Sequence, residues 1–175
     1  GQVYTLYQRR SKLGRVRSEE NVMWSFGVHD VAVLLTLAGQ APDQIQAWGH
    51  AAITPGVEDD TYLHLEFPSG VKASLHNSWL WPKAERELIV VGEKGMLVFE
   101  EVSSRVILHH KVVDSEGFHH DHGEELLFEG SAQPLRLELE HFLECCQKRK
   151  ASISDGQNGF ETVRVLEEAS RILQT

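Results

Sequence analysis

The sequence is poor in cysteine and has no long apolar run. Only two of its 175 residues are cysteines, and Cys145 and Cys146 are adjacent, a spacing too tight for an ordinary disulfide, so we expect reduced structural thiols. No stretch approaches the about eighteen consecutive apolar residues of a membrane-spanning helix, and no secretory signal is visible. These absences predict a cytoplasmic protein with no membrane partner.

Positive charge is also scarce. The chain has 17 Lys and Arg against 26 Asp and Glu, a net charge of −9, which disfavours nucleic acid because phosphate backbones require concentrated basic residues. The basic residues nevertheless cluster ahead of Glu19, the first acidic residue. Since screening acts over roughly 8 Å at physiological salt, a bound anion would feel this cluster more than distant carboxylates. The cluster predicts an anionic small-molecule partner, although a solvated basic arm remains the alternative.

A glycine-rich phosphate loop is the third absence. No GxGxxG lies between a strand and a helix, so the residues offer no cradle for a pyrophosphate. We therefore expect no Rossmann domain in this chain, and the cofactor-binding residues stay unknown.

The pattern of what is present indicates one α+β domain over residues 1–175. With 41% hydrophobic residues, the chain can bury one sizeable core. Alternating polar and apolar residues from Tyr62 to Phe67 indicate a sheet covered on one side. The predicted class is an open, mostly antiparallel β-sheet with helices packed on one face. The predicted parts are a basic loop 7–20, an active-site helix 22–38, a sheet 44–110, a His-rich loop 114–123, and C-terminal helices 134–148 and 158–173.

The helix 22–38 carries the main candidate for catalysis. It has a predicted core-facing side at three- and four-residue spacing, formed by Met23, Trp24, Phe26, Val31, Leu34, Leu35 and Leu37. His29 falls inside this pattern, and a histidine on a buried helix titrates near working pH, so it can exchange a proton with a substrate hydroxyl. A packed or capping histidine is the alternative interpretation.

Several segments together resemble a known family. They are YTLYQRRSKLGRVRSEENVMWSFGVHDVAVLLTLAG, SWLWPKAERELIVVGEKGMLVFE, PLRLELEHFLECC and SISDGQNGFETVRVLEEASRIL. This combination is similar to the C-terminal domain of Gfo/Idh/MocA oxidoreductases. It is most similar to the branch that oxidises nucleotide-linked amino-sugar uronates, where a YxxRxxLGxxRxEEN loop precedes WSFxxHD. The resemblance covers nearly the whole chain, and it identifies the chain as the second half of a two-domain enzyme.

The resemblance implies roles for particular residues. His29 matches the helix histidine that faces the nicotinamide and the reacting carbinol. Arg10, Arg15, Arg17 and Asn21 match the loop that reaches the sugar or its anionic groups. Trp24 and Trp79 are candidates for the pocket wall, or equally for the core. Ser25 stands where many members have an aspartate, which leaves open whether His29 has a carboxylate partner.

The resemblance also implies a cofactor and partners. NAD or NADP serves the full-length parent enzyme, with none expected on this chain alone, and the substrate is an anionic sugar or nucleotide-sugar. The chain alone is expected to be inactive. The run Trp79, Leu80 and Trp81 predicts a homo-oligomer through the sheet face. A non-catalytic anion-binding or assembly module is the alternative function.

A histidine-rich segment is the competing signal for a metal site. Its candidate ligands are His109, His110, His119, His120, Asp121 and His122. Imidazole and carboxylate groups bind zinc, nickel and copper. Because the HHDH cluster is expected in an exposed loop without a supporting shell, we predict no physiological metal site there.

Overall fold

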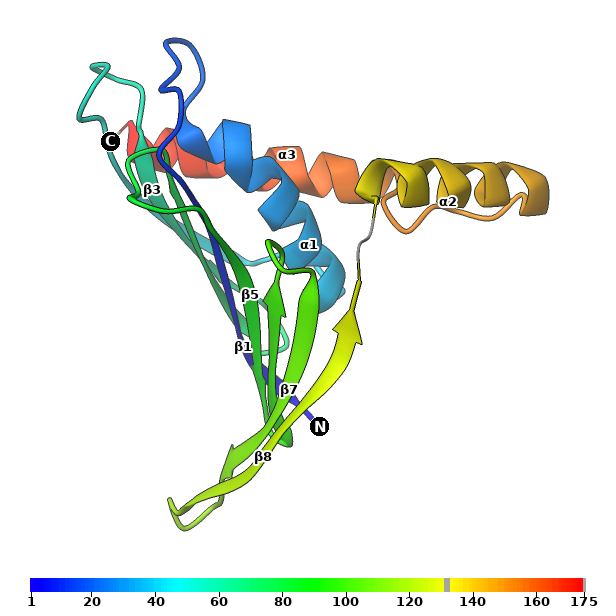
Figure 1. The fold of residues 1–175 in the computed structure, drawn as a ribbon. Helices are drawn as coiled ribbons and strands as arrows, with labels where there is room; N and C mark the ends of the chain where they lie inside the picture. Colours follow the sequence, from blue (N-terminus) through cyan, green and yellow to red (C-terminus); the bar gives the residue numbers. More distant parts are fainter. Residues whose placement is uncertain (131–132, 175) are drawn as a thin grey trace.

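The computed structural model describes residues 1–130 and 133–174, so residues 131–132 and 175 of the predicted domain lie outside it. One eight-stranded sheet dominates, in the order β2-β3-β4-β1-β5-β6-β7-β8 (Figure 1). Its strands are β1 (Val3–Ser11), β2 (Gln44–His50), β3 (Asp60–Glu66), β4 (Lys72–Ser78), β5 (Glu85–Gly92), β6 (Gly95–Glu100), β7 (Arg105–Val113) and β8 (His119–Glu129). Only the β1–β4 pair is parallel among the pairings of the described chain. The predicted open, mostly antiparallel sheet is confirmed.

The predicted basic loop begins too early. Residues 7–11 belong to β1, which lies in the middle of the sheet between β4 and β5. Leu6 and Gln8 alternate with less buried neighbours, so one side of the strand faces the core. Two basic residues of the predicted loop, Arg9 and Arg10, therefore lie in a central strand, and the loop itself starts at Lys12.

Helices cover one face of half of the sheet. The segment predicted as helix 22–38 begins as a π-helical turn, η1 (Met23–Gly27), and continues as α1 (Val28–Ala38). Helix α3 (Gly156–Leu173) packs against α1 and β2. The core between these helices and the sheet includes Met23, Val31, Leu34, Leu63, Leu65, Leu75, Val165 and Leu166. Leu37, predicted to face this core, is instead 49% exposed because it lies on the outer side of α1.

The predicted His-rich loop 114–123 is half strand. Its second part, from His119 onward, belongs to β8 and pairs with β7 in an antiparallel hairpin. Asp114 closes the turn, because its carboxylate accepts the backbone N–H groups of Glu116 and Phe118 at 3.0 and 2.9 Å. Turn residues that bind their own backbone favour a tight hairpin over a long loop. Every residue of β8 is exposed.

Helix α2 (Pro134–Lys148) matches its predicted bounds, but it does not lie on the sheet. It extends beyond the sheet edge, next to the start of α3 (Figure 1). Cys145 is its only buried residue among those described, and both cysteines are free thiols. Leu135, Leu139 and Phe142 are more than half exposed. No helix in the described ranges is both long and apolar enough to cross a membrane.

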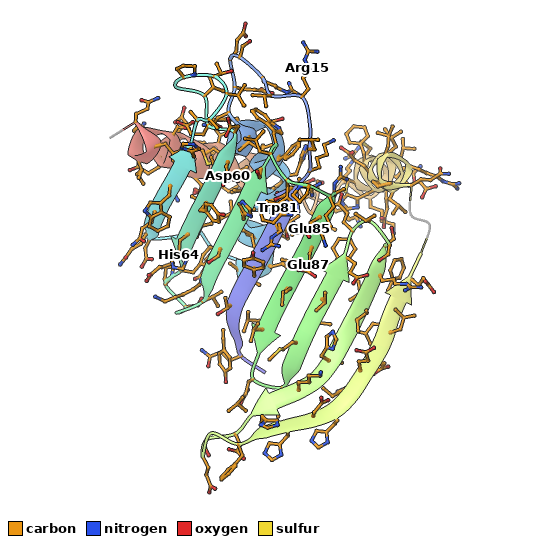
Figure 2. All side chains as sticks on the ribbon, turned by 60° about the vertical axis from the view of Figure 1, so that its left-hand side comes forward. Arg15, Asp60, His64, Trp81, Glu85 and Glu87 are labelled. Carbon is orange, nitrogen blue, oxygen red and sulfur yellow. The ribbon has the colours of Figure 1, made fainter. Side chains whose placement is uncertain are left out.

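The other face of the sheet has no covering helix in the described chain, and Figure 2 shows this side with Asp60, His64, Trp81, Glu85 and Glu87 labelled. Its aromatic residues pack along the strands: Tyr62 stacks on His76 at 4.2 Å between ring centroids, and Trp81 meets His76 edge-on. Trp79 does not contribute to this face, since it is 1% exposed within the chain. The prediction that Trp79, Leu80 and Trp81 form one exposed apolar run is therefore wrong.

Candidate functional site

A cleft of about 640 Å³ lies at one end of the sheet. It is formed by the loop after β1, by η1 and by the connection between β2 and β3. The loop after β1 and the β2–β3 connection lie side by side at the top of Figure 1. The lining residues are Lys12, Gly14, Arg15, Val16, Arg17, Ser18, Glu19, Glu20, Ser25, Phe26, Ile53, Thr54 and Trp79. The structure thus brings Arg15, Arg17 and Ser25, three of the predicted substrate residues, into one cleft.

Cationic side chains border this cleft, and they differ in whether a carboxylate of the chain already neutralises them. Arg17 forms an ion pair with Glu20 at 2.5 Å. Arg15 is exposed, forms no ion pair with any described residue, and lies at the outer part of the loop (Figure 2). The Lys12 ammonium lies 5.6 Å from the ring centroid of Phe26, a cation–π arrangement. Arg15 and Lys12 are therefore the two cations best placed to meet an incoming anion.

The inner part of the cleft is aromatic. Phe26 meets Trp79 edge-on, with 6.2 Å between ring centroids. Trp79 is almost fully buried, and its backbone oxygen accepts the N–H of Gly14 at 3.0 Å. This bond ties the basic loop to the end of β4. Trp79 thus has both roles considered for it, since it belongs to the packed interior and contributes to the wall.

His29 lies beside the cleft rather than inside it. It follows Ser25 by about one helical turn, at the start of α1. Its side chain is exposed, whereas the helix is otherwise buried toward the sheet. The expectation of a histidine within the buried face was therefore wrong. The buried titratable residue of this helix is its neighbour Asp30, which is 1% exposed. An exposed imidazole on this helix is accessible to a ligand in a way that a core histidine is not.

Asn21 and Trp24 face a second cleft, of about 500 Å³, on the other side of residues 19–20. The Asn21 amide donates to Glu58 at 2.8 Å, and its oxygen accepts the N–H of Trp24 at 3.1 Å. The Trp24 indole N–H donates to Ser170 of α3 at 2.9 Å. Both side chains therefore hold η1 against its surroundings. Their predicted contact with substrate stays a prediction.

Arg10 is outside both clefts. From β1 it donates to Asp30 at 2.8 Å and to Glu101 at 2.7 and 3.1 Å, and its side chain is 17% exposed. Its predicted contact with an anionic substrate also stays a prediction, because all three guanidinium nitrogens already bind carboxylates of the chain.

Sequence reasoning did not identify the polar group around Asp30. Its carboxylate accepts from Arg10, from Gln8 at 3.1 Å and from Asn77 at 3.0 Å. Burial raises the pKa of Asp30 above its ordinary value, while Arg10 and Asn77 favour the ionised form. The available signal was a carboxylate inside an apolar helix, because a buried charge requires partners elsewhere in the chain.

The remaining polar clusters show no metal geometry. No three His, Cys, Asp or Glu side chains of the described chain are arranged to hold a metal ion. On the hairpin, His109 and His120 instead pair with Glu124 and Asp114. In α2, the Nε2 of His141 accepts the backbone N–H of Ile153 and lies 3.5 Å from the Cys145 sulfur, which ties the α2–α3 connection to the helix.

Solved structures share this fold. UDP-N-acetylglucosamine 3-dehydrogenase GnnA from Acidithiobacillus ferrooxidans superposes with a TM-score of 0.86 at 19% identity, over 99% of this chain and 56% of that one. A candidate oxidoreductase from Magnetospirillum magnetotacticum MS-1 gives 0.78 at 26% identity, over 95% and 54%. An oxidoreductase from Agrobacterium radiobacter, solved with NAD+, L-tartaric acid and magnesium, gives 0.74 at 13% identity, over 100% and 56%. The chain therefore spans little more than half the length of these proteins.

Sequence comparison identifies the family. No curated protein matches the chain significantly. The model of the GFO/IDH/MocA C-terminal domain matches residues 4–98, which include β1, the basic loop, η1, α1 and the strands through most of β6. This range contains the whole lining of the cleft and the residues that hold Asp30. The resemblance seen in the motifs is confirmed, and the chain belongs to the GFO/IDH/MocA C-terminal domain family.

Proposed function

We propose that this chain is the substrate-binding and assembly half of a cytoplasmic NAD(P)-dependent dehydrogenase. Its substrate would be a sugar or nucleotide-sugar that carries an anionic group. The observation that carries the proposal is the cleft of about 640 Å³, with cations at its border and aromatic rings inside, next to an exposed histidine. One relative in fold is a UDP-N-acetylglucosamine 3-dehydrogenase.

Different residues of the cleft would bind different parts of the substrate. Arg15 and Lys12 would hold the anionic group, because an unpaired guanidinium suits phosphate and carboxylate oxygens. The ring of Phe26 offers an apolar face on which a sugar ring can stack. His29 follows Ser25 by about one turn of the same helical segment, so its imidazole would lie at the end of such a substrate and would exchange a proton with a hydroxyl.

The nicotinamide cofactor would be held by residues outside this chain. The start of α3 does not fit a pyrophosphate, because the carboxylate of its N-cap residue Asp155 accepts the N–H of Asn158 at 2.9 Å, and η1 is preceded by the acidic residues Glu19 and Glu20. A helix terminus binds phosphate through free N–H groups and positive charge, and here a carboxylate takes that place. We therefore propose that the isolated chain neither binds NAD(H) nor turns over substrate.

The test is steady-state kinetics of the full-length protein with nucleotide-sugar substrates. General acid–base catalysis contributes about a hundredfold to ten-thousandfold, so His29→Ala should lower kcat by that order with little change in KM. Ser25→Ala should cost much less, because a neutral hydroxyl does not tune an imidazole as a carboxylate does. Arg15→Ala and Arg17→Ala should mainly raise KM, with the larger effect at Arg15, since Glu20 already neutralises Arg17.

A matched control is Arg136→Ala on α2, an exposed arginine remote from the cleft that should leave both constants unchanged. Circular dichroism of each variant checks folding. If His29→Ala kept kcat within about threefold of the parent, the catalytic proton would belong to another residue. If binding persisted without any turnover in the full-length protein, the anion-binding or assembly module would be the better description.

For assembly, we propose a homo-oligomer through the uncovered sheet face. Trp48 and Tyr62 are about half exposed there, beside a groove of about 500 Å³, and exposed apolar patches of this kind mark interfaces. Light scattering of the chain at micromolar concentration should show a dimer or larger species, and Trp48→Glu should shift it toward monomer. A monomeric parent chain would refute this part of the proposal.

A further inference from the structure

Asp30 is the most heavily hydrogen-bonded carboxylate of the helix layer. It lies in the first turn of α1, directly after His29, and it is 1% exposed. One oxygen accepts from Gln8 and Arg10 at 3.1 and 2.8 Å, and the other accepts from Asn77 at 3.0 Å. The first turn of α1 is thereby bound to both strands of the parallel β1–β4 pair.

The ion pair continues through Arg10 toward the far half of the sheet. Arg10 donates through two nitrogens to Glu101, which follows β6, and Glu101 also accepts from Arg86 of β5 at 3.0 Å. Positive and negative side chains alternate along this network, which links α1, β1, β5 and the end of β6. Every charge in it has an opposite neighbour, as a buried charge requires.

The start of α1 lies between two weaker anchors to α3, the bond from Trp24 of η1 to Ser170 and the bond from Asn158 to the backbone oxygen of Ala32. It joins η1 without a side-chain cap, and Gly27 stands at the junction. A Cβ at Gly27 would lie 2.6 Å from the Oδ1 of Asn77, so the helix approaches β4 closely there. Asn77 therefore contacts the junction through one end of its amide and Asp30 through the other. Adjacent residues on an α-helix point about 100° apart, so holding the Asp30 side chain also fixes the direction in which the His29 side chain leaves the helix.

We propose that Arg10 and Asp30 are positioning residues, which hold the start of α1 so that His29 faces the substrate. This inference rests on the proposed function. A buried ion pair contributes little net stability compared with apolar residues of the same size, because desolvation offsets the attraction. Catalytic groups, in contrast, must be held within about 0.5 Å of their working geometry by a supporting shell. The Asp30 carboxylate, which accepts from three donors directly beside the exposed histidine, is a supporting group of this kind.

Two substitutions at one position separate geometry from folding. Asp30→Asn can keep all three hydrogen bonds: its oxygen accepts from Gln8 and Arg10, and its amide donates to Asn77 once the Asn77 amide turns over. The Oδ1 of Asn77 is free for this, because it has no partner in the described chain. Asp30→Leu keeps the number and branching of the side-chain heavy atoms but removes every hydrogen bond. Arg10→Met is a further variant, which removes the only cationic donor to Asp30 among the described residues and is used if Asp30→Leu does not fold.

The first readout is made on this chain alone and does not depend on activity. In NMR spectra, Asp30→Leu or Arg10→Met should change the nuclear Overhauser contacts between His29 and its neighbours in the first turn of α1, while Asp30→Asn should retain them. Glu66→Gln, which removes the exposed Lys72 partner at the remote end of β3, is the matched control and should leave them unchanged. Unaltered His29 contacts in both Asp30→Leu and Arg10→Met would overturn the inference.

The second readout is kinetic and is made on the full-length protein. Loss of a supporting residue typically costs about 10- to 100-fold, so Asp30→Leu should lower kcat by that order with KM within about threefold, and Asp30→Asn should stay within about threefold of the parent. In a His29→Ala background, Asp30→Leu should have no further effect, because residues that act as a unit are not additive. Equal losses in both backgrounds would overturn the inference. If His29→Ala alone left kcat unchanged, the proposed function would fail, while the NMR result would still decide the positioning.

Discussion

The two halves of the sheet differ in what covers them. Strands β2, β3, β4 and β1 lie beneath α1 and α3, and nearly all fully buried apolar side chains belong to this half. Strands β6 to β8 carry no helix in the described chain, β8 is exposed throughout, and α2 extends past them with most of its leucines in solvent (Figure 1). One half of the sheet thus has a complete core, whereas the other half and α2 expose apolar side chains that no described helix covers.

This difference shows where the chain is self-sufficient. The covered half holds the cleft, His29 and Asp30 with its three donors, and its geometry depends on contacts within the 175 residues. The other half also has regular strands and a regular helix. Its stability derives mainly from backbone hydrogen bonds rather than from burial of side chains. Local stability follows burial, so substitutions in the two halves should have different effects.

The largest expected difference is between Leu65→Ala and Leu139→Ala. Leu65 is fully buried in the covered half, so its truncation should cost about 2–5 kcal/mol of unfolding free energy. Leu139 of α2 is 55% exposed, so the same change should stay within about 0.5 kcal/mol. Urea unfolding of both variants measures this. Equal losses would mean that α2 is covered in solution by another molecule, and the contrast between the halves would disappear.

A smaller difference is expected at the helix starts. Asp155 caps α3 by accepting the N–H of Asn158, whereas Gln133 at the start of α2 makes no side-chain cap. Asp155→Ala should therefore cost about 0.5–2 kcal/mol, and Gln133→Ala should be nearly neutral. Thermal unfolding followed by circular dichroism compares them. A loss at Gln133 matching that at Asp155 would show that α2 is held more firmly than its contacts indicate.

The third prediction concerns Glu101, which links the two halves of the sheet, and it applies only at acidic pH. Burial by itself would raise the pKa of Glu101, but hydrogen bonds and charge from Arg10 and Arg86 outweigh it and leave the pKa below its ordinary value of 4.5. The contribution of Glu101 is therefore present above that value and lost as pH falls through its folded pKa. Urea unfolding between neutral pH and acid should show a shallower decline for Glu101→Gln. A decline as steep as that of the parent would place the acid sensitivity on other carboxylates.

Local pattern was sufficient for most of the elements. Strands β2 to β6 and most of β7 lie within the predicted sheet 44–110, and helix α2 has its predicted bounds 134–148. The wrong predictions lie where charged residues or histidines form a strand. Basic residues in β1 and histidines in β8 looked like loops, because nothing local shows that Arg9 and Arg10 pair with strands far along the chain.

The site divides in the same way. Motifs and charge identified Arg15, Arg17, Ser25 and His29 as candidates, and the first three line one cleft. The exposure of His29 and the burial of Asp30 were not visible, because neighbouring helix residues differ only in which side of the helix meets the sheet. Likewise Arg10 belongs to the same basic cluster as Arg15 in sequence, yet it faces carboxylates inside the fold.

By itself, the sequence determined the α+β class, most element bounds and the family, because hydrophobic periodicity and turn chemistry act over a few residues. Only the tertiary structure decided which charges share space. The parallel pairing of β1 with β4 places Arg10 opposite Asn77, and packing of α1 on these strands brings Asp30 to both. Such contacts join residues 20 and 47 positions apart, and a buried carboxylate is stable only where those donors converge.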